Sequence, residues 1–157
     1  MISIRKYDER FWPDICMIHD AARKIELQYA SLTDAFLPLE KIADAEGLFD
    51  YTHVDLALIG SRAVGFCAYS AEELAWLYIA PEHMHKGIGH KLVSHALDTE
   101  KWLYYVETLF GNEPARRLYE SFGFWVKDIL SGKMPGNEKF DVKVYSMYRG
   151  KHSFRPF

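Results

Sequence analysis

Two glycines, Gly87 and Gly89, stand in a short polar loop directly before an apolar helical pattern. Glycines at such a place let the backbone approach a ligand closely, and the free N–H groups of the first helical turn attract an anion such as pyrophosphate. Lys86, Lys91 and the neighbouring histidines would add positive charge. Ordinary turn formation also explains two glycines in a loop of this kind.

The two common glycine-rich phosphate motifs do not fit this loop. A P-loop requires a glycine, four residues, and Gly-Lys followed by Ser or Thr, and the sequence has no such run. A dinucleotide fingerprint requires a third small residue where Leu92 stands, and its first glycine follows the strand directly. Here Gly87 is the seventh residue after Ala80. If the loop binds an anion, it does so in another structural context.

The elements around the loop can be predicted from their residue patterns. An apolar run from Leu74 to Ala80 leads into it, and Pro81, which cannot donate to a sheet, ends that strand. Beyond the loop, Ile88, Leu92 and Ala96 recur at helical spacing. A strand therefore delivers the glycine loop to a helix N-terminus.

The rest of the chain predicts further strands and helices on both sides of this unit. Apolar runs predict strands over 2–5, 55–59, 63–70, 102–110, 125–130 and 142–147. Helical spacing predicts helices over 13–30 and 112–124 and, interrupted by Pro38, a helical region over 33–47. Asn112 and Gly123 are the start and stop signals of the helix over 112–124. A polar loop is expected over 131–140.

This order of elements predicts an α/β fold with a mixed, mostly antiparallel sheet. Tight turns make the strands at 55–59, 63–70 and 74–80 antiparallel neighbours. The helix after Gly87 joins the strands at 74–80 and 102–110, and such a connection is parallel and right-handed in nearly all proteins. We expect this parallel crossover at the centre, helices on both faces, one domain over 1–157, and a ligand at the carboxyl ends of the crossover strands.

The composition argues against several classes of protein. With 157 residues, 49% of them hydrophobic, the chain can form one domain with an adequate core. A net charge of −3 gives no basic footprint for nucleic acid. No apolar run approaches the ~18 residues of a membrane span, and the early charged residues argue against a signal peptide. Cys16 and Cys67, both in apolar contexts, are interpreted as buried thiols in a reducing cytoplasm rather than as a disulfide.

Two segments at this spacing resemble motifs of the GCN5-related N-acetyltransferase (GNAT) superfamily. LYIAPEHMHKGIGHKL resembles the family's acyl-CoA loop, which has Gln or Arg, two residues, Gly, one residue, and Gly or Ala. NEPARRLYESFGF resembles the following motif, in which an asparagine precedes a helix that carries a tyrosine seven residues on. The resemblance covers 54–125 strongly and the rest loosely. It departs at Met84, where the family has Gln or Arg, and at His85, where a small residue is frequent.

The resemblance implies that the chain binds acetyl-CoA. The backbone of Leu77 and Ile79 would pair with the pantetheine arm as an extra strand. Asn112 would contact the same arm, and Tyr119 would stand near the thioester sulfur. The pyrophosphate would be held by the amides of His85, Lys86, Gly87, Ile88, Gly89 and His90.

Acetyl transfer to an amine needs a neutral nitrogen, a donor for the oxyanion and a proton for the leaving thiolate. An amine with a pKa of about 10.4 is less than about one part in a thousand neutral at pH 7, so a base matters. Glu107, in an apolar strand where family members carry a glutamate, is the predicted base. Glu72, Glu73 or a water are alternatives, and Glu107 could instead be a surface carboxylate.

Tyr119 is the predicted general acid. A phenol with a pKa of about 10 can protonate a thiolate whose conjugate acid has a pKa of about 8.5 at little cost. Tyr119 could instead be a core aromatic on the apolar face of the helix over 112–124. A backbone N–H from 77–79 would hold the oxyanion.

The histidines do not predict a metal site. His83, His85, His90 and His95 cluster in sequence, but the gaps between the last three differ from the i,i+4 spacing that places ligands on one helix face. No acidic or cysteine partner completes a zinc pattern. We expect no metal.

The leading hypothesis is an acetyl-CoA-dependent N-acetyltransferase in which a primary amine, of a small molecule or a peptide, attacks directly in a ternary complex. A non-catalytic acyl-CoA-binding regulatory protein of the same fold is the alternative, and Met84 favours it. An enzyme for a longer acyl chain is a third hypothesis. Acidic residues in 25–53 and 131–140 favour a cationic amine, and the tail over 145–157 could serve a homodimer.

Overall fold

The computed structural model describes residues 1–150, and its helices and strands follow the predicted order along the chain. The helices are α1 (Trp12–Tyr29), α2 (Leu39–Ile42), α3 (Ile88–Thr99) and α4 (Glu113–Glu120). The strands are β1 (Ile2–Lys6), β2 (His53–Ile59), β3 (Arg62–Tyr69), β4 (Glu73–Ile79), β5 (Tyr105–Leu109), β6 (Trp125–Lys133) and β7 (Asp141–Tyr148). Short 3-10 turns lie at Glu9–Phe11, Thr33–Ala35, Leu48–Asp50 and Pro81–His83.

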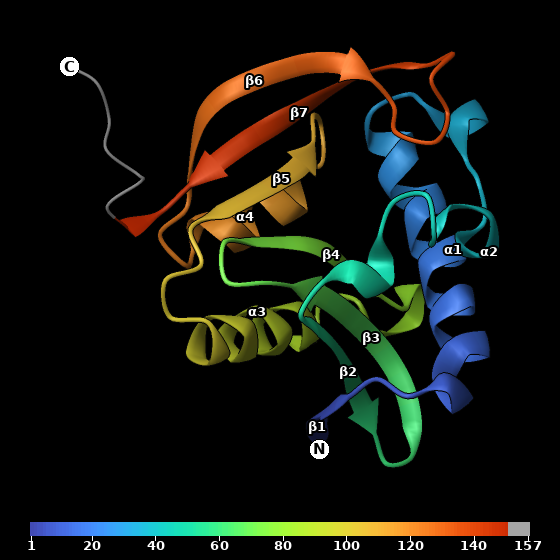
Figure 1. Ribbon diagram of the computed structural model, residues 1–157, viewed down its shortest axis with the longest axis vertical. Helices are drawn as coiled ribbons and strands as arrows, with labels where there is room; N and C mark the ends of the chain where they lie inside the picture. The colour runs from blue at the N-terminus through green and yellow to red at the C-terminus, as the bar shows by residue number, and fades with distance from the viewer. Residues whose placement is uncertain (151–157) are drawn as a thin grey trace.

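The seven strands form one mixed sheet in the order β1-β2-β3-β4-β5-β7-β6. Within residues 1–150, β4 and β5 are the one parallel pair, and their pairing covers only Glu73 with Tyr105 and Leu74 with Val106. Beyond Leu74 the two strands separate, so the sheet consists of a half with β1–β4 and a half with β5, β7 and β6 (Figure 1). The predicted mostly antiparallel sheet with a central parallel crossover is confirmed.

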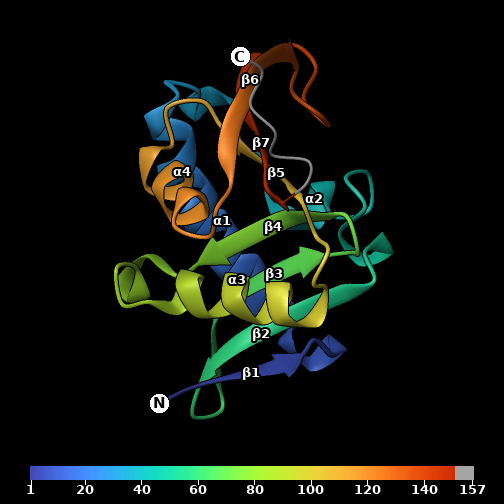
Figure 2. The ribbon, with the colours of Figure 1, turned by 90° about the vertical axis from the view of Figure 1, so that its left-hand side faces the viewer.

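Helices cover both faces of the sheet, as predicted (Figure 2). On one face, Ile15 of α1 and residues of α2 pack with Phe66 and Trp76 of the sheet. On the other face, Leu92 of α3 and Tyr119 of α4 belong to a second apolar cluster. The two clusters fix α1 and α4 on opposite faces of the sheet, beside the point where β4 and β5 separate.

Local turn chemistry sets where the two site helices begin. Gly87 stands at the start of α3 with a φ of 82°, a left-handed conformation that disfavours other residues. Asn112 caps α4, because its side-chain oxygen accepts a hydrogen bond from the Ala115 N–H at 3.3 Å. Directly before the cap, Gly111 has a φ of 99°, and a Cβ there would lie 2.5 Å from the Tyr29 carbonyl oxygen. The end of α1 is therefore packed against the start of α4.

The segment between α1 and β2 is less helical than the sequence predicts. Of the helical region expected over 33–47, only the four residues of α2 form an α-helix. Pro38 disfavours helix before it, and Gly47 ends the following turn with a φ of 68°. The Leu39 N–H donates to the Asp20 carboxylate of α1 at 2.9 Å, so tertiary contact rather than helix propensity holds this segment.

The last two strands are longer than predicted. Lys133 pairs with Asp141 across the β6–β7 ribbon, which shortens the expected loop over 131–140 to 134–140. Tyr145 and Met147 are buried in β7, between β5 and β6, so the exposed tail predicted over 145–157 is wrong for its first part. The part of that prediction that falls on 151–157 lies outside the described residues.

Both cysteines are free thiols. Cys67 is buried, as predicted, whereas Cys16 is half-buried on α1. Among residues 1–150, every helix is too short or too polar to cross a bilayer.

Candidate active site

The loop from β4 to α3 presents a row of unpaired backbone N–H groups. Within residues 1–150, none of the six backbone N–H groups from His85 to His90 donates a hydrogen bond. The next N–H, that of Lys91, donates to the Gly87 carbonyl. His85 and Gly87 have positive φ angles of 64° and 82°. Such alternation in a turn is typical of the N–H nests that bind anions, and the positive end of the α3 dipole lies at the same place.

A first cavity, of about 280 Å³, lies beside this loop between β4, α4 and α1. It is lined by eight of the nine predicted cofactor residues: Leu77, Ile79, His85, Gly87, Ile88, Gly89, His90 and Asn112. The ninth, Lys86, is exposed and does not line it. The helix α1 supplies Ala22, Ile25, Glu26 and Tyr29.

Two features of β4 and α3 make this cavity suitable for an extended ligand. Leu77 and Ile79 belong to the stretch of β4 that has no partner on the β5 side, so its edge is open to pairing with a ligand. Gly89 lies where a Cβ would stand 3.2 Å from Leu118 Cδ2, so a larger residue would take up part of the cavity between α3 and α4.

Asn112 joins the wall of the cavity to α1. Its Oδ1 serves the α4 cap, and its Nδ2 donates to Glu26 Oε2 at 3.1 Å. Its Oδ1 and one of its two side-chain N–H groups therefore have protein partners.

A second cavity, of about 400 Å³, lies between β4, β5, α1 and the loop after β6. Tyr119, Glu107 and Glu73, which the sequence proposes as acid and bases, all line it. Five residues line both cavities: Glu26, Leu77, Tyr78, Asn112 and Ala115. The two cavities therefore meet at the open edge of β4.

Tyr119 is 5% exposed, and its ring packs edge-on against Phe124 with centroids 6.0 Å apart. Its hydroxyl has no hydrogen-bond partner among residues 1–150. Burial raises the pKa of Tyr119 above its ordinary value, and the charge of Glu26 adds to the rise. The phenol, like any tyrosine, is protonated at neutral pH, and its raised pKa makes it a weaker acid than an ordinary tyrosine. Its hydroxyl is free to donate into the second cavity.

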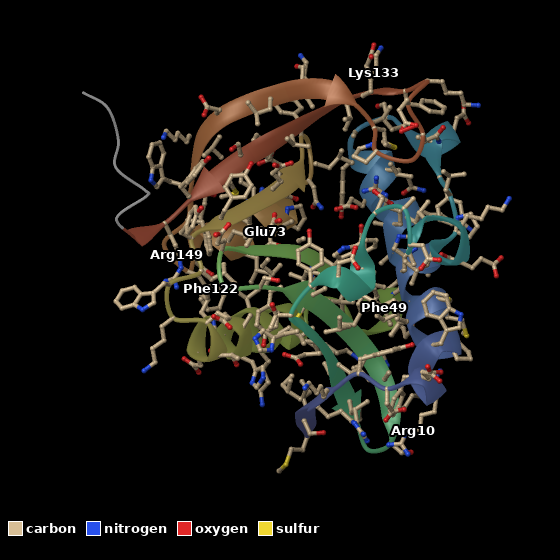
Figure 3. The ribbon with its side chains drawn as sticks, viewed as in Figure 1. Arg10, Phe49, Glu73, Phe122, Lys133 and Arg149 are labelled. Carbon is tan, nitrogen blue, oxygen red and sulfur yellow. The ribbon has the colours of Figure 1, made fainter. Side chains whose placement is uncertain are left out.

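The three candidate bases differ in their surroundings. Burial raises the pKa of Glu73, the charge of Glu107 adds to the rise, and the hydrogen bond from the Tyr51 hydroxyl opposes it. Glu73 lies between the two halves of the sheet, below β5 (Figure 3). Glu107 is exposed and accepts a hydrogen bond from the Tyr105 hydroxyl. Glu72 is exposed and does not line the second cavity. By environment, Glu73 is better suited to proton transfer than Glu107.

Comparison with known proteins agrees with this geometry. The family model described as acetyltransferase (GNAT) domain matches residues 50–126, which hold β2 to α4 and both glycine and asparagine motifs. Over residues 50–126 the chain carries a GNAT acetyltransferase domain. No curated protein sequence matches the chain.

Solved structures similar to this GNAT domain cover nearly the whole chain. The ribosomal-protein-S18-alanine N-acetyltransferase of Escherichia coli is 18% identical, with a TM-score of 0.69, over 99% of this chain and 97% of that one. PaiA N-acetyltransferase of Thermoplasma acidophilum, in complex with coenzyme A, is 20% identical, with a TM-score of 0.62, over 96% of this chain and 99% of that one. YncA of Salmonella typhimurium, a putative acetyltransferase with acetyl-CoA, is 18% identical, with a TM-score of 0.68, over 100% of this chain and 98% of that one. At these identities the likeness establishes the fold.

The residues of this GNAT domain fit an acyl-CoA. The unpaired N–H groups from His85 to His90 match a diphosphate, and the open edge of β4 matches an extended pantetheine arm. Met84 lines the first cavity with an apolar side chain, so the anion is left to the backbone and the positive end of α3. His85 has the left-handed conformation that explains the small residue frequent there in the family.

Sequence reasoning missed the contribution of α1 to the site. Glu26 accepts hydrogen bonds from Arg23, the Tyr78 hydroxyl and Asn112, and it lines both cavities. His19 is completely buried and lines the second cavity. A signal was present, because both residues interrupt the apolar stripe of α1 at helical spacing. Nothing in the sequence says that this stripe faces a cavity.

The part of the chain that the structure describes contains no group of three His, Cys, Asp or Glu residues placed to hold a metal ion. Of the four clustered histidines, His83, His85 and His90 line the first cavity, whereas His95 does not. His90 packs against Phe122 with ring centroids 4.6 Å apart, whereas His95 lies 3.5 Å from Asp55.

Proposed function

We propose that the protein is an acetyl-CoA-dependent N-acetyltransferase that acts on a primary amine by direct attack in a ternary complex. The observation that carries the proposal is the shared wall of the two cavities. A donor in the first cavity and an acceptor in the second would meet at the open edge of β4, beside Tyr119. The structurally similar proteins with bound coenzyme A and acetyl-CoA support an acyl-CoA as the donor.

The chain's own residues supply each requirement of the transfer. The amides from His85 to His90 hold the diphosphate, and the backbone of Leu77 and Ile79 holds the pantetheine arm. An N–H of the same β4 stretch stabilises the oxyanion as the amine nitrogen forms its bond to the acetyl carbon. The amides from His85 to His90 and the β4 N–H are fixed by the backbone before the reaction, so they need little reorganisation.

The two proton transfers fall to different residues. Glu73, directly or through a water, takes a proton from the substrate ammonium and so produces the neutral amine that attacks, since its raised pKa brings it closer to neutral pH than an exposed carboxylate. Glu107, the base that the sequence favours, lines the same cavity and stays the alternative. Tyr119 gives its proton to the thiolate as the carbon–sulfur bond breaks, and the second proton that the acylated nitrogen loses restores the phenol.

An acyl-CoA-binding protein without turnover is the second candidate, and Met84 favours it because the usual side-chain contact to the diphosphate is absent. A screen of primary amines with acetyl-CoA, read out as free thiol and as acetylated product, separates the two. Product from any amine supports the enzyme. Saturable binding of acetyl-CoA with no product from the whole panel supports the binding protein. A parallel series with propionyl- and succinyl-CoA identifies the acyl chain.

A further inference from the structure

Two glutamates of the second cavity lie on neighbouring strands and on the same face of the sheet. Glu73 of β4 pairs in parallel register with Tyr105 of β5, and Glu107 follows Tyr105 by two residues, so the three side chains project from one face. The next pair, Leu74 and Val106, is buried on the other face, in the apolar cluster that contains α3 and α4 residues. The register therefore brings Glu73 and Glu107 together in the wall of the second cavity, which both line.

Each of the two carboxylates accepts a hydrogen bond from a tyrosine. The Tyr51 hydroxyl, from the segment before β2, donates to Glu73 Oε1 at 3.3 Å. The Tyr105 hydroxyl donates to Glu107 Oε2. Because the Tyr105 proton is engaged there, Ser146 Oγ donates to the Tyr105 oxygen at 3.0 Å. Glu73 and Glu107 are therefore held by separate partners.

The surroundings of the two carboxylates differ. Glu73 is half-buried where the two halves of the sheet separate (Figure 3), whereas Glu107 is exposed. Two like charges that share a site oppose each other's ionisation, and the carboxylate with less contact with water takes a proton more readily. Burial raises the pKa of Glu73, the hydrogen bond from Tyr51 opposes the rise, and the charge of Glu107 adds to it. Of the pair, Glu73 is thus better placed to take a proton, and Glu107 acts on it as a negative charge.

Tyr51 is a hydrogen-bond donor over the whole pH range in which a carboxylate titrates. Burial raises the pKa of Tyr51 to about 12, and the charge of Glu73 adds to the rise. A phenol makes a stronger hydrogen bond to an ionised carboxylate than to a protonated carboxyl group. Tyr51 therefore holds Glu73 in one orientation and in the form that can accept a proton.

A third cavity, of about 420 Å³, adjoins this hydrogen bond. Tyr51 and Glu73 line both the second and the third cavity, whereas Glu107 lines the second and not the third. The contact between Tyr51 and Glu73 therefore lies at the boundary of the two cavities. Water that enters the third cavity can take the proton from Glu73 without passing the amine.

Other charged groups face Glu73 from the elements around it. Glu72 precedes it on β4, and the charge of Glu72 raises its pKa less than that of Glu107 does. The remaining acidic and basic side chains that line the second or the third cavity are His19, Arg23, Glu26, Glu46 and Asp50. Tyr51 and Glu107 are the neighbours whose removal should change the titration of Glu73 most, and in opposite directions.

We propose that Tyr51 is the positioning residue of the base Glu73, and that Glu107 is the negatively charged neighbour of that base rather than the base itself. This inference rests on the proposed function, because it divides acetyl transfer between the two candidate bases. Tyr51 keeps Glu73 ionised and oriented before the reaction. The charge of Glu107 strengthens the attraction of Glu73 for the proton of the substrate ammonium.

The acid limb of the kcat/KM profile, measured with an accepted amine, tests this division. Glu107→Gln should keep the limb and move it to lower pH, whereas Tyr51→Phe should move it to higher pH. At the pH where the wild type has half of its maximal kcat/KM, we expect Tyr51→Phe to show about a quarter or less of its own maximum. At the same pH, Glu107→Gln should show about three quarters or more of its own maximum.

Carbon-13 NMR titration of the glutamate carboxyl groups in the full-length protein gives a readout without turnover. The Glu73 signal is the one that Glu73→Gln removes. Its titration midpoint should rise in Tyr51→Phe and fall in Glu107→Gln. Tyr7→Phe is the matched control and should leave the midpoint unchanged, because Tyr7 and Tyr51 pack against the same apolar cluster but Tyr7 lines neither cavity.

The inference is overturned if Tyr51→Phe leaves the Glu73 midpoint and the acid limb unchanged. It is also overturned if Glu107→Gln abolishes the limb, which would make Glu107 the base. Its failure differs from that of the proposed function. Midpoints that move as expected in a protein that acetylates no amine support the arrangement of Tyr51, Glu73 and Glu107 and contradict the enzyme. Product formation with an acid limb that neither variant moves supports the enzyme and contradicts the inference.

Discussion

Replacing Tyr119 with phenylalanine removes one hydroxyl from the wall of the second cavity and leaves the buried ring against Phe124 in place. Within residues 1–150 this hydroxyl has no hydrogen-bond partner, so its loss leaves no protein group unsatisfied. We therefore expect the free energy of unfolding to change by less than about 0.5 kcal/mol.

The rate is expected to respond very differently. A positioned general acid contributes about 100- to 10,000-fold, and the raised pKa of Tyr119, which makes it a weaker acid, places the expected contribution in the lower part of that range. We expect Tyr119→Phe to lower kcat by about 100- to 1,000-fold, which corresponds to about 3–4 kcal/mol in the barrier. Tyr119 lines the second cavity and not the first, so the Kd of acetyl-CoA should change by less than about threefold.

Thiol release in the steady state gives kcat, and calorimetry gives the Kd. Tyr148→Phe is the matched control, because it removes a β7 hydroxyl that lines neither cavity. A Tyr119→Phe enzyme with a rate within threefold of the wild type would refute the acid role. An equal loss of rate and cofactor binding would refute it as well, since it would indicate a structural role.

Three further variants test other parts of the site. The raised pKa of Glu73 means that kcat/KM falls as the pH drops through that pKa, because a protonated carboxyl cannot accept a proton. Glu73→Gln should lower the rate about 10- to 100-fold and abolish this acid limb in a pH profile, and a limb that persists belongs to another group. Gly89→Val directs its Cβ to within 3.2 Å of Leu118 Cδ2 and should raise the Kd of acetyl-CoA at least about tenfold in calorimetry. An unchanged Kd would contradict the close approach of the ligand to this turn. Gly111→Ala places its Cβ 2.5 Å from the Tyr29 carbonyl oxygen at a φ of 99°, so thermal unfolding should show a loss of at least about 2 kcal/mol. A variant as stable as the wild type would contradict this packing.

The elements with their own local signals were predictable from the sequence. Pro81 ended the strand before the glycine loop, and Asn112 and Gly123 marked the limits of the helix between them. The order of strands and helices, the parallel crossover and the GNAT resemblance followed from these signals. The GNAT resemblance implied eight of the residues that line the first cavity.

The features that depend on tertiary contact were not predictable. The sequence pattern over 33–47 favoured helix, but only the four residues of α2 form an α-helix, and Leu39 at its start is held by Asp20 of α1. Glu26 and His19 became visible as site residues only once α1 was placed beside the open edge of β4. The sequence favoured Glu107 over Glu73 as the base, and the difference in their burial depends on how the two halves of the sheet separate.

The central claim is that backbone N–H groups from His85 to His90 hold the diphosphate of an acyl-CoA. Calorimetry of the wild-type protein with acetyl-CoA and with S-acetylpantetheine, which carries the same thioester arm but no diphosphate, tests it most directly. We predict saturable binding of one acetyl-CoA per chain, at least about 100-fold tighter than S-acetylpantetheine, which corresponds to about 2.8 kcal/mol. No binding of acetyl-CoA, or equal affinity for the two compounds, would contradict the claim.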